Sequence, residues 1–251
     1  MNGLVAALYR HPVKGFTPER LASAELAAGG FFPCDRIYAV EDGPSGFDPA
    51  APAFVPKTRF AVLAKIPEVA RARTTYDEAT GVLTVQGPGM PPLSAPLGEP
   101  AGRERFEAWL AGLLGEAASG RLKVVHAEGH RFTDHPQGYV SILNLNSVRD
   151  LKRRMGRPID PRRFRANIHI DGWPAWAEND AVDRELRLGT ARVKIFKPIV
   201  RCAATEVNPD TAVRDAEIPR ALFDNYGNLH CGVYATVTAS GRVAEGDGVA
   251  P

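Results

Sequence analysis

Cysteine is scarce in this chain of 251 residues. The three cysteines, Cys34, Cys202 and Cys231, are odd in number and widely spaced, and no Cys-x-x-Cys pair occurs. This pattern argues against a disulfide framework and against a cysteine-based zinc site. It favours a reducing compartment, and we therefore expect a cytoplasmic protein.

Long apolar runs are also absent. No stretch approaches the roughly 20 apolar residues that a membrane-spanning helix needs, so we expect no membrane segment. The apolar run GLVAALY at residues 3–9 has no Lys or Arg before it, and Arg10 follows at once. We interpret this run as a first strand rather than a signal peptide.

An excess of charge of one sign is missing as well. Lys and Arg number 31 and Asp and Glu number 29, which gives a formal net charge of +2. The exception is local, because residues 149–165 (RDLKRRMGRPIDPRRFR) hold eight basic and two acidic residues. A solvated helix face followed by a basic loop is the ordinary explanation. Nucleic-acid binding is the alternative, but the balanced total charge and the lack of nearby aromatic residues weaken it, and we expect no nucleic-acid partner.

The common signatures of nucleotide and hydrolase sites do not occur. There is no P-loop, no G-x-G-x-x-G after a strand, no G-x-S-x-G and no H-E-x-x-H. His126, His130 and His135 have spacings that could suit zinc, but Gly129 disfavours a helix carrying the first two together. We interpret the three as surface or turn histidines rather than metal ligands.

What is present is a series of short strands between many turns. The 24 glycines and 21 prolines indicate many short elements. Apolar or alternating runs predict strands, and Gly81 supplies the turn in TTYDEATGVLTV. The predicted strands are LVAALY, RIYAV, FAVLAKI, TTYDEATGVLTV, ANIHIDG, ELRLGTARVKIF, CAATEV and CGVYATVT. The pattern predicts a β-dominated α+β fold, with two barrel-like parts sharing a cleft.

A few segments interrupt the β-pattern. Residues 88–100 hold five prolines and are interpreted as a linker. Apolar residues at helical spacing predict a helix over 106–114 and a second over 148–155, the latter with Ser147 as N-cap. A short helix is expected near PRALFDNY.

Single residues suggest chemistry only weakly when each is taken alone. Lys14 lies in the tight loop HPVKG, and Arg36 enters a strand in CDRIYAV; solvation or a salt bridge explains either. Arg165 is expected to enter the strand FRANIHI, where an inward guanidinium could bind a phosphate through two hydrogen bonds. Cys202 would ordinarily be a small buried strand residue. The adjacent Arg201 could stabilise its thiolate, and the turn-rich TEVNPDT places it near a strand end.

Taken together these segments resemble a known family. The chain is similar to MOSC-domain proteins that carry an N-terminal MOSC β-barrel domain, and in particular to the amidoxime-reducing components and their bacterial relatives. The resemblance runs in order through LYRHPVKG, CDRIYAVED, LNSVRDLKRRMG, RFRANIHIDG, KPIVRCAATEVNPDTA and GVYATVTASGRVAEGD. It implies a β-barrel domain over residues 1–95 and a MOSC domain over residues 96–251.

The resemblance also implies a molybdenum cofactor of the molybdopterin type, bound in the cleft between the two domains. Cys202 corresponds to the cysteine that ligates molybdenum and is the implied catalytic residue, and a soft thiolate suits such a metal. Lys14 and Arg36 correspond to residues that bind the pterin phosphate. The other implied cofactor-binding residues are Ser147, Arg165, Asn167, Arg201 and Thr205, of which Ser147 could instead be only the helix cap.

The implied reaction is removal of an oxygen atom from a small N-hydroxylated substrate, such as an amidoxime or a hydroxylamine. Cofactors of this kind carry the chemistry, and the protein positions them. The chain ends soon after the last MOSC strand, so we expect a separate electron donor of the ferredoxin or flavoprotein type. An alternative function is a binding module that carries the cofactor or transfers its sulfur without turnover of its own.

Overall fold

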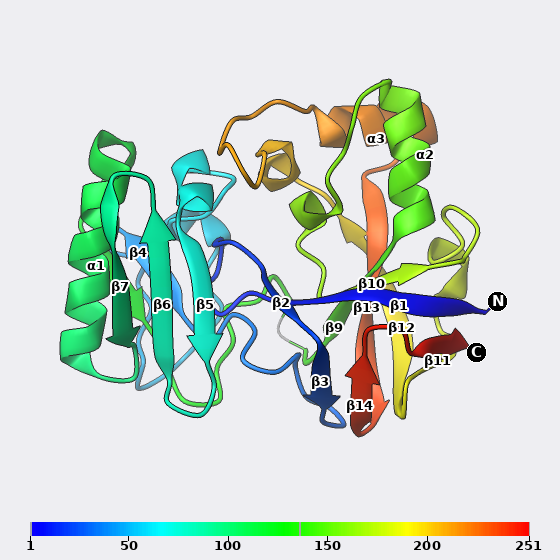
Figure 1. The fold of residues 1–251 in the computed structure, drawn as a ribbon, viewed down its shortest axis with the longest axis horizontal. Coiled ribbons are helices and arrows are strands. Elements are labelled where there is room, and N and C mark those ends of the chain that lie inside the picture. The colour runs from blue at the N-terminus through cyan, green and yellow to red at the C-terminus, as the bar shows by residue number, and fades with distance from the viewer. Residues whose placement is uncertain (1, 136, 251) are drawn as a thin grey trace.

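The chain folds into two β-rich halves, which lie side by side in Figure 1. The structure is a computed structural model that describes residues 2–135 and 137–250. The described α-helices are α1 (Pro100–Leu114), α2 (Leu145–Met155) and α3 (Ile218–Tyr226). Strands make up most of the remaining regular structure, so the predicted β-dominated α+β class is confirmed.

The larger half is a closed barrel. Its sheet has the strand order β10-β9-β13-β12-β11-β15-β1-β2, and β10 also pairs with β1, which closes the sheet. The strands are β1 (Gly3–Arg10), β2 (Glu19–Leu21), β9 (Val140–Asn144), β10 (Ile168–Asp171), β11 (Glu185–Leu188), β12 (Ala191–Val200), β13 (His230–Ala239) and β15 (Gly248–Ala250). Closure removes the exposed edges that an open sheet would present.

Alternating side chains build the interior of this barrel. Val193 and Ile195 of β12 point inward, while Arg192 and Lys194, which alternate with them, are exposed. This alternation follows from the two-residue repeat of a strand. The inward residues pack with Val233 and other buried side chains of the neighbouring strands to form one apolar core.

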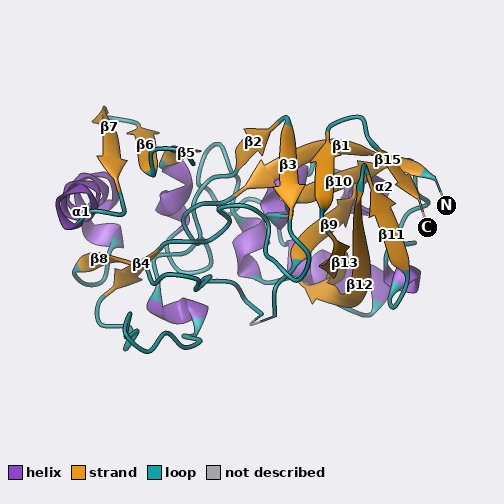
Figure 2. Ribbon diagram, turned by 90° about the horizontal axis from the view of Figure 1, so that it is seen from below, coloured by secondary structure: helices purple, strands orange, loops and turns teal. Residues whose placement is uncertain are grey.

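The smaller half has its own core around a three-stranded sheet. This sheet consists of β5 (Arg73–Asp77), β6 (Val82–Gly87) and β7 (Met90–Pro96). The strand pair β4 (Ala39–Asp42) with β8 (Leu122–Val125) completes this half, whereas the pair β3 (Ser23–Leu26) with β14 (Gly241–Ala244) packs its buried side chains into the barrel core. Helix α1 covers β7, and its Trp109 Nε1 donates a hydrogen bond to the Pro91 carbonyl at 2.7 Å. Figure 2 shows α1 beside this sheet, away from the barrel.

Several local predictions are wrong. FAVLAKI is not a strand, because only Phe60 forms an isolated bridge, with Glu41, and a turn follows. The proline-rich segment 88–100 is not a linker, because it contains β7, and an edge strand tolerates prolines that cannot donate to a ladder. CAATEV is not a strand, because Ala203–Glu206 forms a 3₁₀ turn that begins after Cys202. Ser147 is not the N-cap of α2, because the helix begins at Leu145 and the Asn144 side chain accepts the capping hydrogen bond from Asn146 N.

The N-terminal strands belong to the barrel and not to the smaller half. Strand β1 pairs with β10 of the barrel, and β3 pairs with β14 near the C-terminus, so the chain leaves the barrel for the smaller half and then returns to it. The boundary between residues 95 and 96 stays a prediction. Among the described residues, none of the helices combines the length and the apolar character that crossing a bilayer would require.

Candidate functional site

Loops from both halves line one cleft between them. Its lining side chains include six cations and a single carboxylate, Asp134. The cations are Lys14, Arg36, Lys57, Arg163, Arg165 and Arg201. A cleft lined mainly by one sign of charge concentrates ligands of the opposite sign, so this cleft is suited to an anion.

The cleft brings together most of the residues that the sequence singled out. Six of the eight line it, and two do not. Those that line it are Lys14, Arg36, Arg165, Arg201, Cys202 and Thr205. They come from segments that are distant in sequence, so only the folded chain makes them neighbours.

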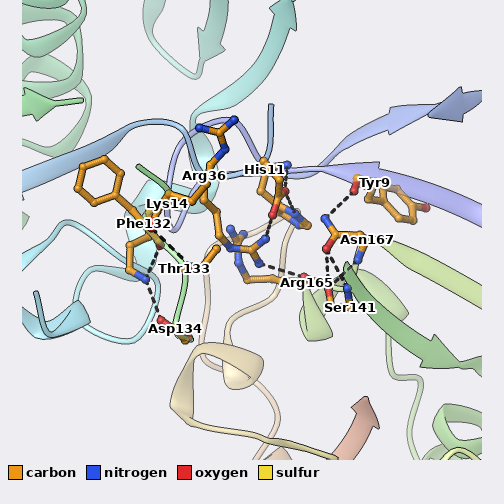
Figure 3. A network of polar contacts seen from close by, with 12 residues as sticks. Tyr9, His11, Lys14, Arg36, Phe132, Thr133, Asp134, Ser141, Arg165 and Asn167 are labelled. Carbon is orange, nitrogen blue, oxygen red and sulfur yellow. Dashed lines mark hydrogen bonds and ion pairs between the residues drawn. The ribbon is translucent and has the colours of Figure 1, made fainter. Parts of the chain in front are cut away.

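Lys14 is held rigidly at the wall formed by the smaller half. The loop is tight because Gly15 has φ +91°, and a Cβ there would lie 2.8 Å from Val62 Cα. Lys14 Nζ donates to the Phe132 carbonyl and to Asp134 Oδ1, each at 2.8 Å (Figure 3). Burial lowers the pKa of Lys14, although Asp134 acts in the opposite direction.

Asp134 is the partner of two lysines. Its Oδ2 lies 3.8 Å from Lys57 Nζ, while its Oδ1 accepts the hydrogen bond from Lys14. Burial raises the pKa of Asp134, but the positive charges of Lys14 and Lys57 outweigh burial and hold that pKa at about 2. The carboxylate therefore stays ionised at neutral pH.

Arg36 is anchored by a buried acidic group behind the cleft. Its backbone is left-handed, with φ 52°, and its guanidinium pairs with Asp35. Asp35 Oδ1 also accepts a hydrogen bond from His11 N at 2.7 Å. Arg36 Nη2 donates to the Arg165 carbonyl at 3.2 Å, which links the two walls of the cleft (Figure 3). Burial lowers the pKa of Arg36, and Asp35 more than offsets this.

Arg165 lies before the strand, not in it. It has a left-handed backbone with φ 52° at the end of the 3₁₀ turn Pro161–Phe164, and β10 begins only at Ile168, so the expectation that it enters a strand is wrong. Its Nη1 donates to the Phe16 carbonyl, and its Nη2 is buried with no partner in the described part of the chain. Burial and the neighbouring Arg36 lower the pKa of Arg165 to about 9.

Arg201, like Arg165, has a buried guanidinium nitrogen that lacks a hydrogen-bond partner among the described residues. Its Nε donates to the Cys231 carbonyl at 2.7 Å and its Nη1 to the Phe164 carbonyl at 2.6 Å. Its Nη2 is buried and has no partner among residues 2–135 and 137–250. A Cβ at Gly232 would lie 3.0 Å from this Nη2, so glycine keeps the space beside it open. Buried guanidinium hydrogens without acceptors are costly, and an anion in the cleft would satisfy them.

Cys202 presents a free, half-buried thiol to the cleft. Its carbonyl accepts hydrogen bonds from Thr205 N at 3.0 Å and from Thr205 Oγ1 at 2.9 Å, which fix the turn that follows it. Lys57 Nζ lies 3.3 Å from the sulfur. The other two cysteines lie outside the cleft, and burial raises the thiol pKa of Cys34 to about 11 and that of Cys231 to about 12.

Asn167 and Ser147 do not line the cleft. Asn167 Oδ1 accepts hydrogen bonds from Ser141 N at 3.1 Å and Ser141 Oγ at 2.7 Å, so it supports a residue that does line it. Ser147 Oγ is buried and donates to Glu178 Oε2 at 2.9 Å. The implied cofactor contacts of these two residues stay predictions.

The sequence did not point to Lys57 or to the aromatic wall. Lys57 begins the 3₁₀ turn Lys57–Arg59 after a proline-rich loop, and no motif marks it. Tyr139 and Tyr234 line the cleft with ring centroids 4.3 Å apart. No motif marks Asp134 either, and in the structure its Oδ1 accepts the hydrogen bond from Lys14.

The basic segment 149–165 is largely neutralised by acidic partners. Arg149 makes a two-pronged contact with Asp171 at 2.6 Å, and Arg153 pairs with Asp150 at 2.7 Å. The remaining pairs join Arg157 and Arg163 to Asp215, and Arg162 to Asp160 and Asp210. The surface is therefore less basic than the sequence run, and the expected absence of a nucleic-acid partner stays a prediction.

The histidines near the cleft contact aromatic rings rather than one another. His126 lies 5.1 Å from Tyr38, and His130 lies 4.8 Å from Phe132, both between ring centroids. Across the residues that the structure describes, no three His, Cys, Asp or Glu side chains form a group that could hold a metal ion by themselves.

Comparison with protein families matches two domains that follow one another along the chain. Residues 2–119 match the MOSC N-terminal beta barrel domain, and residues 129–250 match the MOSC domain. The chain belongs to the MOSC family. This places the cleft between two recognised MOSC modules.

Curated relatives of this MOSC protein match only in part. It is 37% identical over 87 residues to mitochondrial amidoxime reducing component 2 of Bos taurus, which covers 35% of this chain and 25% of the relative. The human protein of that name is 38% identical over 85 residues, with coverage of 34% and 25%. The molybdenum cofactor sulfurase of Drosophila ananassae is 28% identical over 144 residues, with coverage of 53% and 18%. The matches thus span about a quarter or less of each of these relatives.

Among solved structures, the YUAD protein from Bacillus subtilis aligns with 99% of this chain and 94% of its own, at 14% identity and a TM-score of 0.47.

Proposed function

We propose that this MOSC protein is a molybdenum-cofactor-dependent oxidoreductase that reduces N-hydroxylated substrates, such as amidoximes and hydroxylamines. The main support is one arrangement in the cleft: a free Cys202 thiol lies beside a cationic lining in which Arg165 and Arg201 each keep a buried Nη2 without a partner. The relatives named amidoxime reducing component support the choice of reaction.

The lining residues fit a molybdopterin-type cofactor by their chemistry. A cofactor of this type brings a phosphate, and guanidinium groups bind phosphate through charge-assisted hydrogen bonds. Arg165 Nη2 and Arg201 Nη2 are donors that need such an acceptor. Cys202 offers the soft sulfur ligand that molybdenum would take.

Each residue then has a definite task. Cys202 would hold the metal, and Lys14, Arg36, Arg165 and Arg201 would hold the anionic part of the cofactor. The Asp35 carboxylate fixes Arg36, and Thr205 fixes the turn that carries the thiol. When bound, the molybdenum cofactor would supply the two-electron redox chemistry.

The reaction balances with two electrons and two protons. The N–O bond of the substrate breaks, nitrogen is reduced, and the oxygen leaves as water. The electrons come from a separate ferredoxin- or flavoprotein-type donor, and the protons come from solvent.

Benzamidoxime reduction tests the proposal. Protein purified from a host that makes the cofactor is assayed for molybdenum and then for benzamidine formation with reduced methyl viologen as donor. We expect near-stoichiometric molybdenum and turnover. Metal-loaded protein that forms no benzamidine contradicts the reductase assignment.

A second candidate is a carrier of the cofactor or of its sulfur. The observation that favours it is the match to molybdenum cofactor sulfurase, which covers 53% of this chain and therefore more of it than the amidoxime-reducing matches. A carrier would release cofactor to an apo-molybdoenzyme and show no turnover with benzamidoxime, so the same preparation distinguishes the two functions.

A further inference from the structure

Lys57 is a lining cation whose ammonium group contacts the Cys202 sulfur. Its Nζ lies 3.3 Å from Cys202 Sγ and 3.8 Å from Asp134 Oδ2. It reaches the sulfur from the smaller half, whereas Cys202 belongs to the larger one. No motif or matched domain assigns a role to this side chain.

Lys57 differs from the other lining lysine in exposure. The Lys57 side chain is 38% exposed, and that of Lys14 is 7% exposed. Lys14 uses its ammonium on the Phe132 carbonyl and Asp134 at 2.8 Å each, whereas the Lys57–Asp134 contact is a looser 3.8 Å. Lys57 is therefore the lysine that an incoming molecule meets beside the sulfur.

The neighbourhood of Lys57 leaves its charge available. Asp134 is the only carboxylate among the lining residues, and it is shared with Lys14. An ammonium has three donors, and the contacts found within the described residues are those to the Cys202 sulfur and to Asp134. At least one donor can therefore turn to a ligand without breaking a contact.

We infer that Lys57 is a substrate-positioning residue that makes the cleft prefer N-hydroxylated substrates carrying a carboxylate or a similar anionic group. This inference rests on the proposed reductase function for its substrate class. A point charge on a flexible stem attracts an anionic group strongly without requiring one fixed geometry. A neutral amidoxime gains nothing from this contact, so the preference appears as a difference between two substrates.

The first test needs neither metal nor turnover. Alkylation of Cys202 is followed by mass spectrometry with anionic iodoacetate and with neutral iodoacetamide, on metal-free protein. The Cys202 thiolate attacks the CH2 carbon of both reagents and displaces iodide, so the ratio of the two rates cancels the thiolate fraction and reports attraction of the anion. We expect Lys57→Gln to lower the iodoacetate/iodoacetamide ratio by about threefold to tenfold, since one charge at this range is worth that factor.

Two variants keep this test decisive. Lys57→Arg retains the charge and should keep the ratio within about twofold of the original protein. Lys123→Gln removes an exposed lysine of β8 that lies outside the cleft, and it should leave the ratio unchanged. An unchanged ratio in Lys57→Gln, or an equal loss in Lys57→Arg, overturns the inference.

The second test uses the loaded enzyme. We expect kcat/KM for 4-carboxybenzamidoxime relative to benzamidoxime to fall by about threefold to tenfold in Lys57→Gln, mostly through KM, and to recover in Lys57→Arg. If neither amidoxime is reduced, the reductase function fails while the alkylation ratio still decides whether Lys57 attracts anions. If both are reduced and the relative kcat/KM is the same in Lys57→Gln, the substrate preference is wrong.

Discussion

The two walls of the cleft hold their positive charge in different ways. On the wall from the smaller half, Lys14 is paired with Asp134 and Arg36 with Asp35. On the wall from the barrel, Arg165 and Arg201 are held by backbone carbonyls and each keeps a buried Nη2 without a partner. Lys14 and Arg36 are thus neutralised by the protein, whereas Arg165 and Arg201 each keep a donor for a ligand.

The difference suggests a division of labour. Carbonyl acceptors orient a guanidinium without cancelling its charge, so the barrel wall retains its attraction for an anion. The paired wall is already stable in the absence of ligand, and its ion pairs must rearrange before the cations serve a ligand fully. The barrel wall should therefore contribute more to cofactor affinity.

The largest effect is expected at the sulfur on the barrel wall. Cys202→Ser should lower amidoxime reduction by more than about 100-fold, since a direct metal ligand outweighs supporting contacts. Turnover per bound molybdenum measures this, with Cys34→Ser as the matched control outside the cleft. Undiminished turnover in Cys202→Ser would refute its role as ligand.

The comparison itself is tested by removing one cation from each wall. Arg165→Met should weaken cofactor retention by about 10- to 100-fold, because charge-assisted hydrogen bonds contribute roughly 1.5–3 kcal/mol. Lys14→Met should weaken it less, since its charge is already shared with Asp134. Molybdenum per protein after dialysis measures both, and a greater loss in Lys14→Met would reverse the proposed division.

Buried histidines behind the two walls should make stability depend on pH. His11 contacts Asp35 behind the first wall, and His169 belongs to β10 of the barrel. Burial lowers the pKa of each to about 3, from an ordinary value of 6.5. The unfolded chain therefore binds more protons between pH 6.5 and 3, so stability is fully present above pH 6.5 and is lost as the pH falls.

Denaturant unfolding at several pH values measures this loss. The free energy of unfolding should fall by up to about 1.4 kcal/mol per pH unit for each histidine. His169→Gln should reduce the histidine contribution to the slope to about half, and an unchanged slope would show that folding does not lower the pKa of His169.

The smallest effects are expected on the exposed face of α2, whose arginines Arg149 and Arg153 do not line the cleft. Arg149→Ala and Arg153→Ala remove exposed ion pairs and should change the free energy of unfolding by less than about 1 kcal/mol. Fluorescence anisotropy with a labelled 20-nucleotide DNA should show no salt-dependent affinity, because these arginines already have acidic partners. Strong binding of the DNA that weakens with added salt would support nucleic-acid binding by residues 149–165.

Much of the fold could be predicted from local patterns. Barrel strands β1, β10, β11, β12 and β13 and the helices α1, α2 and α3 follow from periodicities that depend only on neighbouring residues, whereas strands β2, β9 and β15 were not predicted. The errors have local causes too. The prolines of 88–100 indicated a linker where the edge strand β7 lies. Cys202 was placed in a strand, although a 3₁₀ turn begins directly after it.

The amino-acid sequence by itself determined the β-dominated class, the MOSC resemblance and six residues that prove to line one cleft. These properties are encoded in short segments, which can be compared one at a time. Only the tertiary structure decided which cations are neutralised, that Asn167 and Ser147 lie outside the lining, and that Lys57 stands 3.3 Å from the Cys202 sulfur. The reason is physical: charge pairing and burial depend on distances between side chains that are 145 residues apart, and the packing of the two halves around the cleft sets those distances.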